Sequence, residues 1–399
     1  MANTSAPPKT TVAQKSAVAL GVLASIEVIM MISPFAAYFY SFFRPFLNIF
    51  SQWQATAWLD GFFLNHALIS TSPALEWQRE IGRYLFAAGV WGFVISFFEV
   101  YGRKVFRKGV ARYGLYAVVR HPQYLSLAVA GWGLLTIWPR FFLLLLYVTM
   151  LFVYFLLAAH EERRMAALYP QTYPDYAKGK GSFLPGSPGD WLYQRTFARL
   201  PNKALGAISC YASVLILAVL AGGVVRGQVQ SSAEMVVRPE ARVYGFSCWP
   251  QGQEKLAGIV DRLLADDTVR RKMEDSGAEL FFLHALPEDY GMKGMFYRRQ
   301  GPRRSRGLAR IAAAFLFPRP QINRGSGLMG HPTEQLQVVV SRVSQPWRDE
   351  IPFEQGLQPG TKMVPLAVVT LDASDDGVPL EVTTPVPENH WGNLTMPIF

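Results

Sequence analysis

Long apolar runs separated by short charged segments dominate the first 225 residues of the chain. The longest run covers residues 125–159 and is interrupted only at residues 138–140, Trp-Pro-Arg. A transmembrane helix needs about 20 apolar residues, so this run predicts two helices joined by a tight turn. The two arms, residues 120–139 and 140–161, extend roughly 28 Å and roughly 32 Å at about 1.5 Å per residue. Because the arms match, we expect their charged outer ends to meet at one membrane face.

Further apolar runs predict three more membrane-spanning helices, at residues 17–43, 81–100 and 205–225. The first of these runs is longer than the apolar core of a signal peptide, which favours a retained helix. Residues 44–80 alternate aromatic and polar groups, which indicates an interfacial or re-entrant segment. The pattern therefore predicts about five transmembrane helices.

The rest of the chain has the pattern of a water-soluble domain. Residues 254–273 carry apolar side chains at helical spacing. Residues 335–343 and 364–371 are β-branched runs bounded by turn residues, which is typical of strands. Residues 226–399 therefore predict a soluble α+β domain.

The expected fold is a multi-pass α-helical membrane bundle with a C-terminal soluble α+β domain. We expect a disordered N-terminus at residues 1–15, the bundle at residues 16–225 and the soluble domain at residues 226–399. Half of the 399 residues are hydrophobic and 17% are charged, as in a membrane protein with a sizeable soluble part. The two cysteines, Cys210 and Cys248, are too few for a disulfide framework.

Positive charge indicates how the bundle is oriented. The net charge is +10, and lysines and arginines are dense in residues 102–120 and 161–203. By the positive-inside rule both segments face the cytoplasm, where anionic lipid headgroups are expected partners. The soluble domain then faces outward, which is the periplasm for a protein of a bacterial inner membrane. No aromatic-interleaved basic motif accompanies the charge, so nucleic acid is not an expected partner.

A second basic segment lies within the predicted soluble domain. Between Asp289 and Glu334 there is no acidic residue. The same stretch holds the arginines Arg298, Arg299, Arg303, Arg304, Arg306, Arg310, Arg319 and Arg324. It is either a docking face for an anionic protein partner or a solvated basic loop.

The ends of the predicted hairpin carry the residues best suited to chemistry. Arg120-His121-Pro122-Gln123-Tyr124 precedes the first arm, and His160-Glu161-Glu162-Arg163 ends the second. A helix N-terminus favours a carboxylate, and glutamates accept hydrogen bonds from ammonium and hydroxyl groups. The two clusters together would suit a zwitterionic cofactor presented to a lipid-borne substrate.

These motifs carry a resemblance to a known family. The block from Gly114 to Tyr124, the apolar hairpin, Glu161-Glu162, and the distal Tyr173, Tyr176 and Pro185 are found in this order. Over roughly residues 80–186 the chain resembles the isoprenylcysteine carboxyl methyltransferase and phospholipid N-methyltransferase superfamily, integral-membrane methyltransferases. Two positions depart from the family pattern. Ser126 stands where the family has glycine, and Tyr169-Pro170 stands where it has Phe-Gly.

The resemblance implies S-adenosylmethionine (SAM) as methyl donor. It also implies a lipid or a lipid-linked carboxyl or amine group, entering laterally between helices, as methyl acceptor. Arg120 and Glu162 are the expected catalytic residues. The expected cofactor-binding residues are Arg120, His121, Tyr124, Glu161, Glu162, Tyr173 and Tyr176. No metal is expected, because the histidines lack ligand spacing.

Other interpretations of these residues stay open. The charged clusters could be ordinary headgroup anchors at helix ends, and Tyr173 and Tyr176 could be interfacial aromatics. A similar Arg-His-Pro-x-Tyr block occurs in NADPH-dependent sterol reductases, although their other signatures are absent here. The chain could also be a methyltransferase-like subunit of a larger complex without activity of its own.

Overall fold

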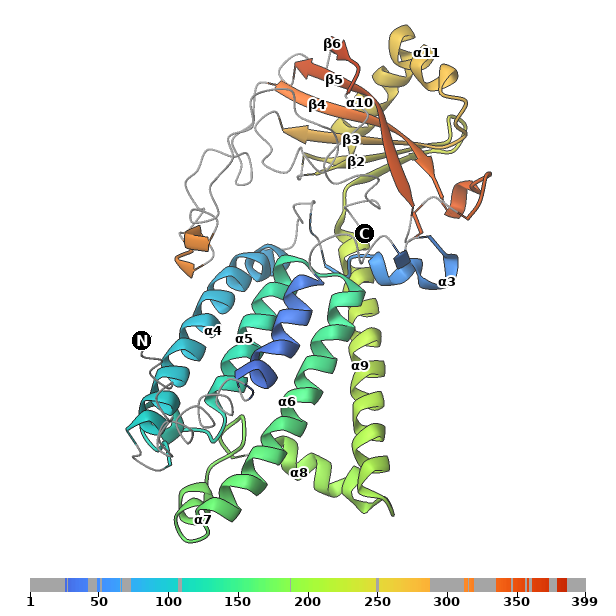
Figure 1. The fold of residues 1–399 in the computed structure, drawn as a ribbon. Helices are drawn as coiled ribbons and strands as arrows, with labels where there is room; N and C mark the ends of the chain where they lie inside the picture. Colours follow the sequence, from blue (N-terminus) through green and yellow to red (C-terminus); the bar gives the residue numbers. More distant parts are fainter. Residues whose placement is uncertain are drawn as a thin grey trace, which may run out of the picture.

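The computed structural model describes residues 26, 28–41, 49–50, 52–64, 66, 73–106, 110–186, 188–248, 251–287, 312–314, 316–318, 335–345, 347–355, 357–358, 361–372 and 379–385. Residues 1–15, expected to be disordered, lie outside this set, and so do the arginines at positions 298–324. The described residues form a helical bundle with a sheet region at one end (Figure 1).

The bundle contains five apolar helices of different lengths among the described residues. They are Val28–Tyr40, α4 (Pro73–Val105), α5 (Pro122–Ile137), α6 (Phe141–Leu168) and α9 (Lys203–Ser232). Three are long and apolar enough to cross a membrane: α4 over Ile81–Arg103, α6, and α9. Helix α5 has 16 residues, about 24 Å at 1.5 Å per residue. The structure thus gives three candidate spans where the sequence predicts about five.

Helix α5 packs directly against α4 through glycines. A Cβ atom added to Gly89 would lie 2.3 Å from the Ala130 nitrogen. One added to Gly133 would lie 2.3 Å from the Phe86 nitrogen. Such distances mean that the two helix backbones touch, with no room for side chains between them. This contact fixes the position of α5 and of the residues that precede it.

The predicted tight turn joins α5 to α6, and the described part of segment 52–66 covers it. The Phe63 amide donates to the Pro139 carbonyl at 2.9 Å, and Phe62 forms an isolated bridge with Arg140. Arg140 is 1% exposed and forms a buried ion pair with Asp60. Its guanidinium carbon lies 4.1 Å from the centre of the Phe62 ring. The turn is therefore held by backbone pairing and by one buried charge pair.

Residues 73–80, the last part of the segment predicted as interfacial or re-entrant, form the first turns of α4, which begins at Pro73. The candidate membrane span within α4 starts at Ile81, as the sequence predicts. Proline is favoured in the first turn of a helix. The residues that follow it include Ala74, Leu75 and Glu76, all good helix formers.

The sheet region follows α9 directly. Its strands are β1 (Met235–Arg238), β2 (Val243–Ser247), β3 (Phe281–Pro287), β4 (Gln335–Ser344), β5 (Lys362–Asp372) and β6 (Pro379–Thr383). They form one sheet in the order β1-β2-β3-β4-β5-β6. Strands β2 and β3 are parallel, and the other neighbours are antiparallel. Parallel neighbours need a crossover, which α10 (Gln253–Ala265) and α11 (Asp267–Asp275) supply.

The helix expected at residues 254–273 is thus two helices. Asp266 separates them, because its carboxylate accepts hydrogen bonds from the Thr268 and Val269 amides at the start of α11. This is a helix N-cap, which begins a new helix at the point where the previous one ends.

The two faces of the sheet are covered differently. Helices α10 and α11 cover one face, through residues such as Leu256, Ile259 and Leu263. On the other face, the aromatic core around Tyr244 and Phe282 packs against Trp138 of the α5–α6 turn. The sheet region therefore contacts the bundle at the turn, at the end of the helices away from α7 and α8 (Figure 1).

Candidate functional site

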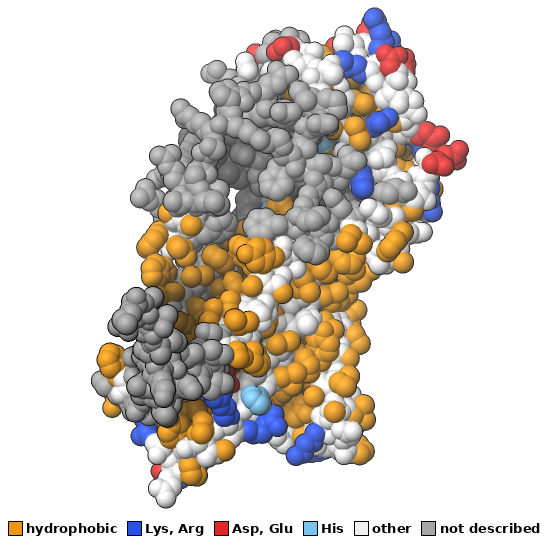
Figure 2. Space-filling view, viewed as in Figure 1, with side chains coloured by type: hydrophobic (Ala, Val, Ile, Leu, Met, Phe, Trp, Pro, Cys, Tyr) orange, Lys and Arg blue, Asp and Glu red, His pale blue; other side chains and the backbone are white. Residues whose placement is uncertain are grey.

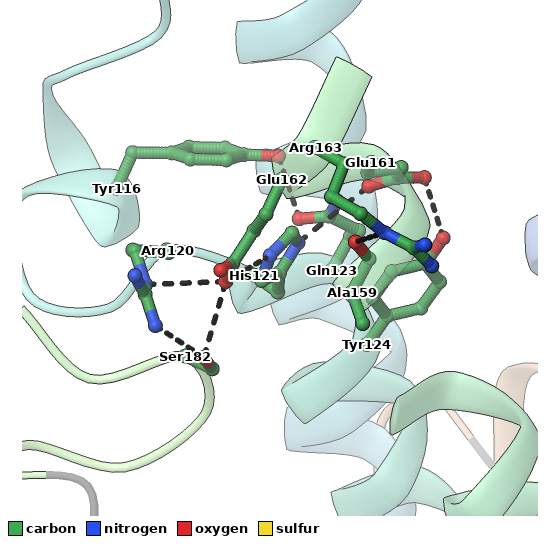
Figure 3. A network of polar contacts seen from close by, with 10 residues as sticks. All are labelled: Tyr116, Arg120, His121, Gln123, Tyr124, Ala159, Glu161, Glu162, Arg163 and Ser182. Atoms are coloured by element: carbon green, nitrogen blue, oxygen red, sulfur yellow. Dashed lines mark hydrogen bonds and ion pairs between the residues drawn. The ribbon is translucent and has the colours of Figure 1, made fainter. Parts of the chain in front are cut away.

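The two charged ends of the hairpin meet at the end of the bundle away from the sheet region. Arg120 and His121 directly precede α5, and Glu162 lies in the last two turns of α6. The Arg120 Nε atom lies 3.2 Å from Glu162 Oε1. The His121 Nε2 atom lies 3.0 Å from the same oxygen (Figure 3). The equal arms of the hairpin thus bring the basic and acidic clusters into direct contact.

The His121 imidazole lies between two carboxylates. Its Nδ1 atom is 3.5 Å from Glu161 Oε2, on the side opposite Glu162. Burial disfavours the charged form of the ring, but the hydrogen bonds and charges of Glu161 and Glu162 outweigh it and raise the pKa of His121 above 6.5. Only the protonated ring can donate from both nitrogens at once. The geometry therefore favours an imidazolium bridging the two acids.

Tyr124 holds the second carboxylate from one turn into α5. Its hydroxyl donates to Glu161 Oε1 at 2.6 Å, and the residue itself is 1% exposed. Its ring stacks on Tyr154 of α6 with centroids 5.0 Å apart. Glu161 is thereby fixed to α5 through both Tyr124 and His121.

A loop after α7 (Thr172–Ala177) completes the cluster. The Arg120 amide donates to the Gly181 carbonyl at 3.0 Å, and the His121 amide donates to the Ser182 carbonyl at 2.9 Å. The Ser182 hydroxyl accepts from Arg120 Nη2 at 2.5 Å and donates to Glu162 Oε1 at 3.1 Å. The loop therefore fixes both the backbone and the side chains of the basic motif (Figure 3).

Tyr116, in the 3₁₀ turn η2 (Gly114–Ala117), links the same elements from the other side. Its hydroxyl donates to Gln123 Oε1 at 2.7 Å. Its carbonyl accepts from the Tyr176 hydroxyl at 2.9 Å and from Lys180 Nζ at 3.3 Å. One peptide unit thus ties η2 to α7 and to the loop behind Arg120.

Tyr173 and Tyr176 are packing residues behind the charged cluster. Each is 7% exposed, and together with Val110 they form a small buried core. Burial raises the pKa of Tyr176 to about 12. Neither side chain is an exposed interfacial aromatic.

The two departures from the family pattern lie outside the cluster. Ser126 is buried, and its hydroxyl lies 2.7 Å from where a Cβ of Gly92 would be. Its side chain therefore faces α4, where a glycine provides the space it needs. Tyr169 ends α6, and its amide donates to the Met165 carbonyl. Neither residue belongs to the network of polar contacts around His121 that Figure 3 draws.

The cluster is partly accessible. The side chains of Arg120, Glu162 and Glu161 are 17%, 24% and 37% exposed. Figure 2 shows lysines and arginines gathered below a wide apolar band, at the end of the bundle that carries α7 and α8. Exposed apolar side chains, among them Leu115, Val118 and Leu184, lie in the neighbouring loops. The site thus combines charged groups with an apolar surround.

Three contributors were not singled out as site residues in the sequence: Tyr116, Gln123 and Ser182. Tyr116 and Gln123 lie within the block that carries the family resemblance, and that position was a reason to consider them as site residues. Ser182 follows a Lys-Gly-Lys-Gly stretch that could equally be a surface loop. In the part of the chain that the structure describes, no group of three or more His, Cys, Asp or Glu side chains is arranged to hold a metal ion.

Comparison with known proteins agrees with the sequence resemblance. Residues 77–172 match the family model described as phospholipid methyltransferase. This segment includes α4 from Trp77 onward, the basic motif, α5 and α6, and it ends just before Tyr173. No curated protein and no solved structure matches the chain significantly. The match implies a membrane methyltransferase domain within the helical bundle, consistent with the isoprenylcysteine carboxyl methyltransferase and phospholipid methyltransferase superfamily.

Proposed function

We propose that this protein is a SAM-dependent methyltransferase of a bacterial inner membrane that methylates a lipid or a lipid-linked group. The observation that carries the proposal is the contact of Arg120 and His121 with Glu162, 3.2 Å and 3.0 Å from one carboxylate oxygen. The contact lies inside the segment that matches the phospholipid methyltransferase family.

The residues present fit the polar groups of SAM. Its carboxylate would be held by the guanidinium of Arg120, whose Nε lies 3.2 Å from Glu162 Oε1 and whose Nη2 donates to Ser182. Its ammonium and ribose hydroxyls would be held by Glu161 and Glu162, which supply acceptor oxygens. Tyr124 and Ser182 would keep the two carboxylates in place, and Tyr173 and Tyr176 would form the wall behind Arg120. When bound, SAM supplies an electrophilic methyl carbon on a sulfonium for in-line displacement.

The chain's own contribution is orientation and exclusion of water. Methyl transfer needs an aligned acceptor more than it needs acid-base groups. The half-buried cluster lies beside apolar loop residues that would keep a lipid acceptor close to it. A carboxylate acceptor needs no base. An amine acceptor must first lose a proton, which Glu161 Oε2 would take once His121 Nδ1, 3.5 Å away, withdraws from it.

The positions of the sheet region and the charged cluster support placing them at opposite faces of the membrane. The sheet region and the charged cluster lie at opposite ends of the helices (Figure 1). We therefore propose that the bundle, residues 16–225, holds the site at the cytoplasmic face. Residues 226–399 would then form a domain on the periplasmic side. Labelling of a cysteine introduced at the exposed Thr268 in intact cells tests this orientation.

One observation favours a different function. The four charged side chains of the cluster, Arg120, His121, Glu161 and Glu162, already form ion pairs with one another, as they would in a purely structural network. A methyltransferase-like subunit without activity would keep the same contacts. The two functions differ in whether Arg120 and Glu162 can be removed without loss of activity.

The test is transfer of labelled methyl from SAM to total membrane lipid by the purified full-length protein, with NADPH as a parallel arm. Under the proposal, lipid becomes labelled, and Arg120→Ala and Glu162→Gln abolish the labelling. Arg163→Ala is the matched control, because Arg163 is exposed and its Nε donates to Ala159 of its own helix. Consumption of NADPH, or full activity of Arg120→Ala in cells, would count against the proposal.

A further inference from the structure

The connection between β3 and β4 is much longer than the sheet requires. The two strands are antiparallel neighbours, and Pro287 pairs with Leu336. Such a pair can be joined by two to five residues, as a rough guide. Here residues 288–334 stand between the two strands in the sequence. A connection of this length between paired strands indicates a task beyond joining them.

Described residues of this connection contact the bundle. The Trp91 indole Nε1 donates to the Leu316 carbonyl at 3.2 Å. The rings of Trp91 and Phe317 lie with their centroids 5.6 Å apart. Trp91 belongs to the candidate membrane span Ile81–Arg103. Leu316 and Phe317 therefore lie against this candidate span, and residues 312–314 and 316–318 lie apart from the strands (Figure 1).

The contacting residues are apolar, but their side chains are exposed. Phe317 is 61% exposed and Trp91 is 42% exposed. Ala312, Ala313 and Ala314 are also exposed. Exposure of such a cluster to water costs about 25 cal/mol per Å² of apolar surface. Lipid acyl chains remove this cost, and the surface of Ile81–Arg103 beside these residues is already suited to lipid, with only 22% of its apolar stretch buried.

The sequence around these residues is positively charged, which suits an anionic lipid surface. Arg310 precedes the apolar stretch and Arg319 follows it, and no acidic residue occurs between Asp289 and Glu334. An apolar stretch bounded by arginines is typical of segments that enter the interface of an anionic leaflet. An apolar stretch between arginines suits an anionic lipid surface, which offers both acyl chains and negatively charged headgroups.

We propose that residues 312–314 and 316–318 are a membrane anchor of the sheet region. They enter the acyl-chain layer of the leaflet nearest the sheet, against Trp91, and their partner is an anionic lipid surface. The anchor would hold the sheet region on the membrane beside α4. This proposal stands on contacts away from Arg120 and Glu162, so it does not depend on methyltransferase activity.

Two measurements on the full-length protein in lipid nanodiscs test the anchor. Both use a Cys210→Ser background, in which Cys248 can stay because it is fully buried. First, Trp91→Cys with Phe317→Cys should cross-link, whereas Trp91→Cys with Thr268→Cys should not. Second, a fluorophore on Phe317→Cys should be quenched by nitroxide-labelled lipid and shielded from iodide. The same fluorophore on Thr268→Cys should show the reverse.

The anionic partner is tested by varying nanodisc composition. Quenching of the label at position 317 by nitroxide lipid should rise when anionic phospholipid replaces part of a zwitterionic one. A label at position 317 that is quenched by iodide as strongly as the label at position 268 would overturn the anchor. Equal lipid quenching with and without anionic phospholipid would overturn the assigned partner.

Discussion

The His121 imidazole and the Glu162 carboxylate lie 3.0 Å apart, although 41 residues separate them along the chain. The hairpin of α5 and α6 creates this contact, because its arms return the end of α6 to the start of α5. The same nitrogen-oxygen pair connects the basic motif, the acidic motif and, through Ser182, the loop after α7. This convergence gathers the proposed SAM-binding groups at one end of the bundle.

Removal of either side of the ion pair should weaken SAM binding. Arg120→Ala deletes the proposed carboxylate ligand, and Glu162→Gln deletes the proposed acceptor. Hydrogen bonds to charged groups contribute about 1.5–3 kcal/mol each, so each variant should raise the dissociation constant by about tenfold to a hundredfold. Equilibrium titration of purified variants measures this.

The double variant adds a sharper test. Because Arg120 and Glu162 contact each other, the two effects should not add. Arg163→Ala should bind SAM as the unaltered protein does. Strictly additive losses, or an equal loss in Arg163→Ala, would contradict a shared site.

The stability of the folded protein should depend on pH through His121. The pKa of His121 is raised by Glu161 and Glu162 in the folded protein, so the imidazolium contributes stability that is fully present below about pH 6.5. This contribution is lost as pH rises through the folded pKa, because the neutral ring cannot donate to both acids. The free energy of unfolding, measured from about pH 6 to about pH 9, should therefore fall with rising pH. His121→Gln should flatten the profile, and an unchanged slope in that variant would assign the titration elsewhere.

The hairpin was the part of the fold most accessible from sequence. Its prediction needed only the length of an apolar run, the breaking effect of Pro139 and the rise of a helix. The convergence of Arg120 with Glu162 followed from equal arms. The strands at residues 335–343 and 364–371 were likewise predicted from β-branched runs, and β4 and β5 extend them by one or two residues at their ends.

Other features depend on contacts between distant segments. Nothing local marks Ser182 as a partner of Glu162, because its role comes from backbone pairing of the loop with Arg120 and His121. The order of the six strands and the position of Trp138 against the sheet are also long-range. Asp60 and Arg140 each look like ordinary flanking charges until the turn brings them together.

Close packing of α4 and α5 should be sensitive to a single methyl group. Gly89→Ala and Gly133→Ala each place a Cβ within 2.3 Å of a backbone nitrogen, so the helices must separate. Overpacking of this kind typically costs about 1–3 kcal/mol. Thermal unfolding in detergent should show the loss, and SAM binding should weaken as α5 moves.

Gly223→Ala is the matched control in α9, because a Cβ there meets nothing within 4 Å. It should leave the melting temperature unchanged or slightly higher, since alanine favours a helix over glycine. Equal destabilisation at positions 89 and 223 would mean that helix packing is not the cause.

The buried pair at the turn should be intolerant of losing one partner. Asp60→Asn leaves the Arg140 charge buried at 1% exposure. Breaking a buried pair in this way typically costs about 3–5 kcal/mol. Combining Asp60→Asn with Arg140→Met removes the uncompensated charge and should recover part of the stability. Melting temperatures of the three proteins check this, and a double variant less stable than Asp60→Asn would contradict it.

Acid should destabilise the sheet region through His284. This residue is fully buried in β3, stacked on Phe246, and burial lowers its pKa to about 3. Between about pH 6.5 and about pH 3 the unfolded chain binds a proton that the folded chain does not. Stability should therefore fall as pH drops through this window, by up to about 1.4 kcal/mol per pH unit.

The buried thiol of Cys248 reports this unfolding. It is 0% exposed and lies in the same aromatic core as Phe246. In a Cys210→Ser background, the urea concentration that exposes Cys248 to a thiol reagent should fall as pH drops. His284→Gln does not titrate in this range and should weaken the dependence. An equally steep dependence in that variant would point to another group.

The most direct test is calorimetric titration of the purified full-length protein with SAM. Saturable binding at one site per chain, weakened about tenfold to a hundredfold in Arg120→Ala and unchanged in Arg163→Ala, is the predicted result. An absence of saturable SAM binding by the unaltered protein would contradict the proposal that the Arg120–Glu162 cluster is a methyl-donor site.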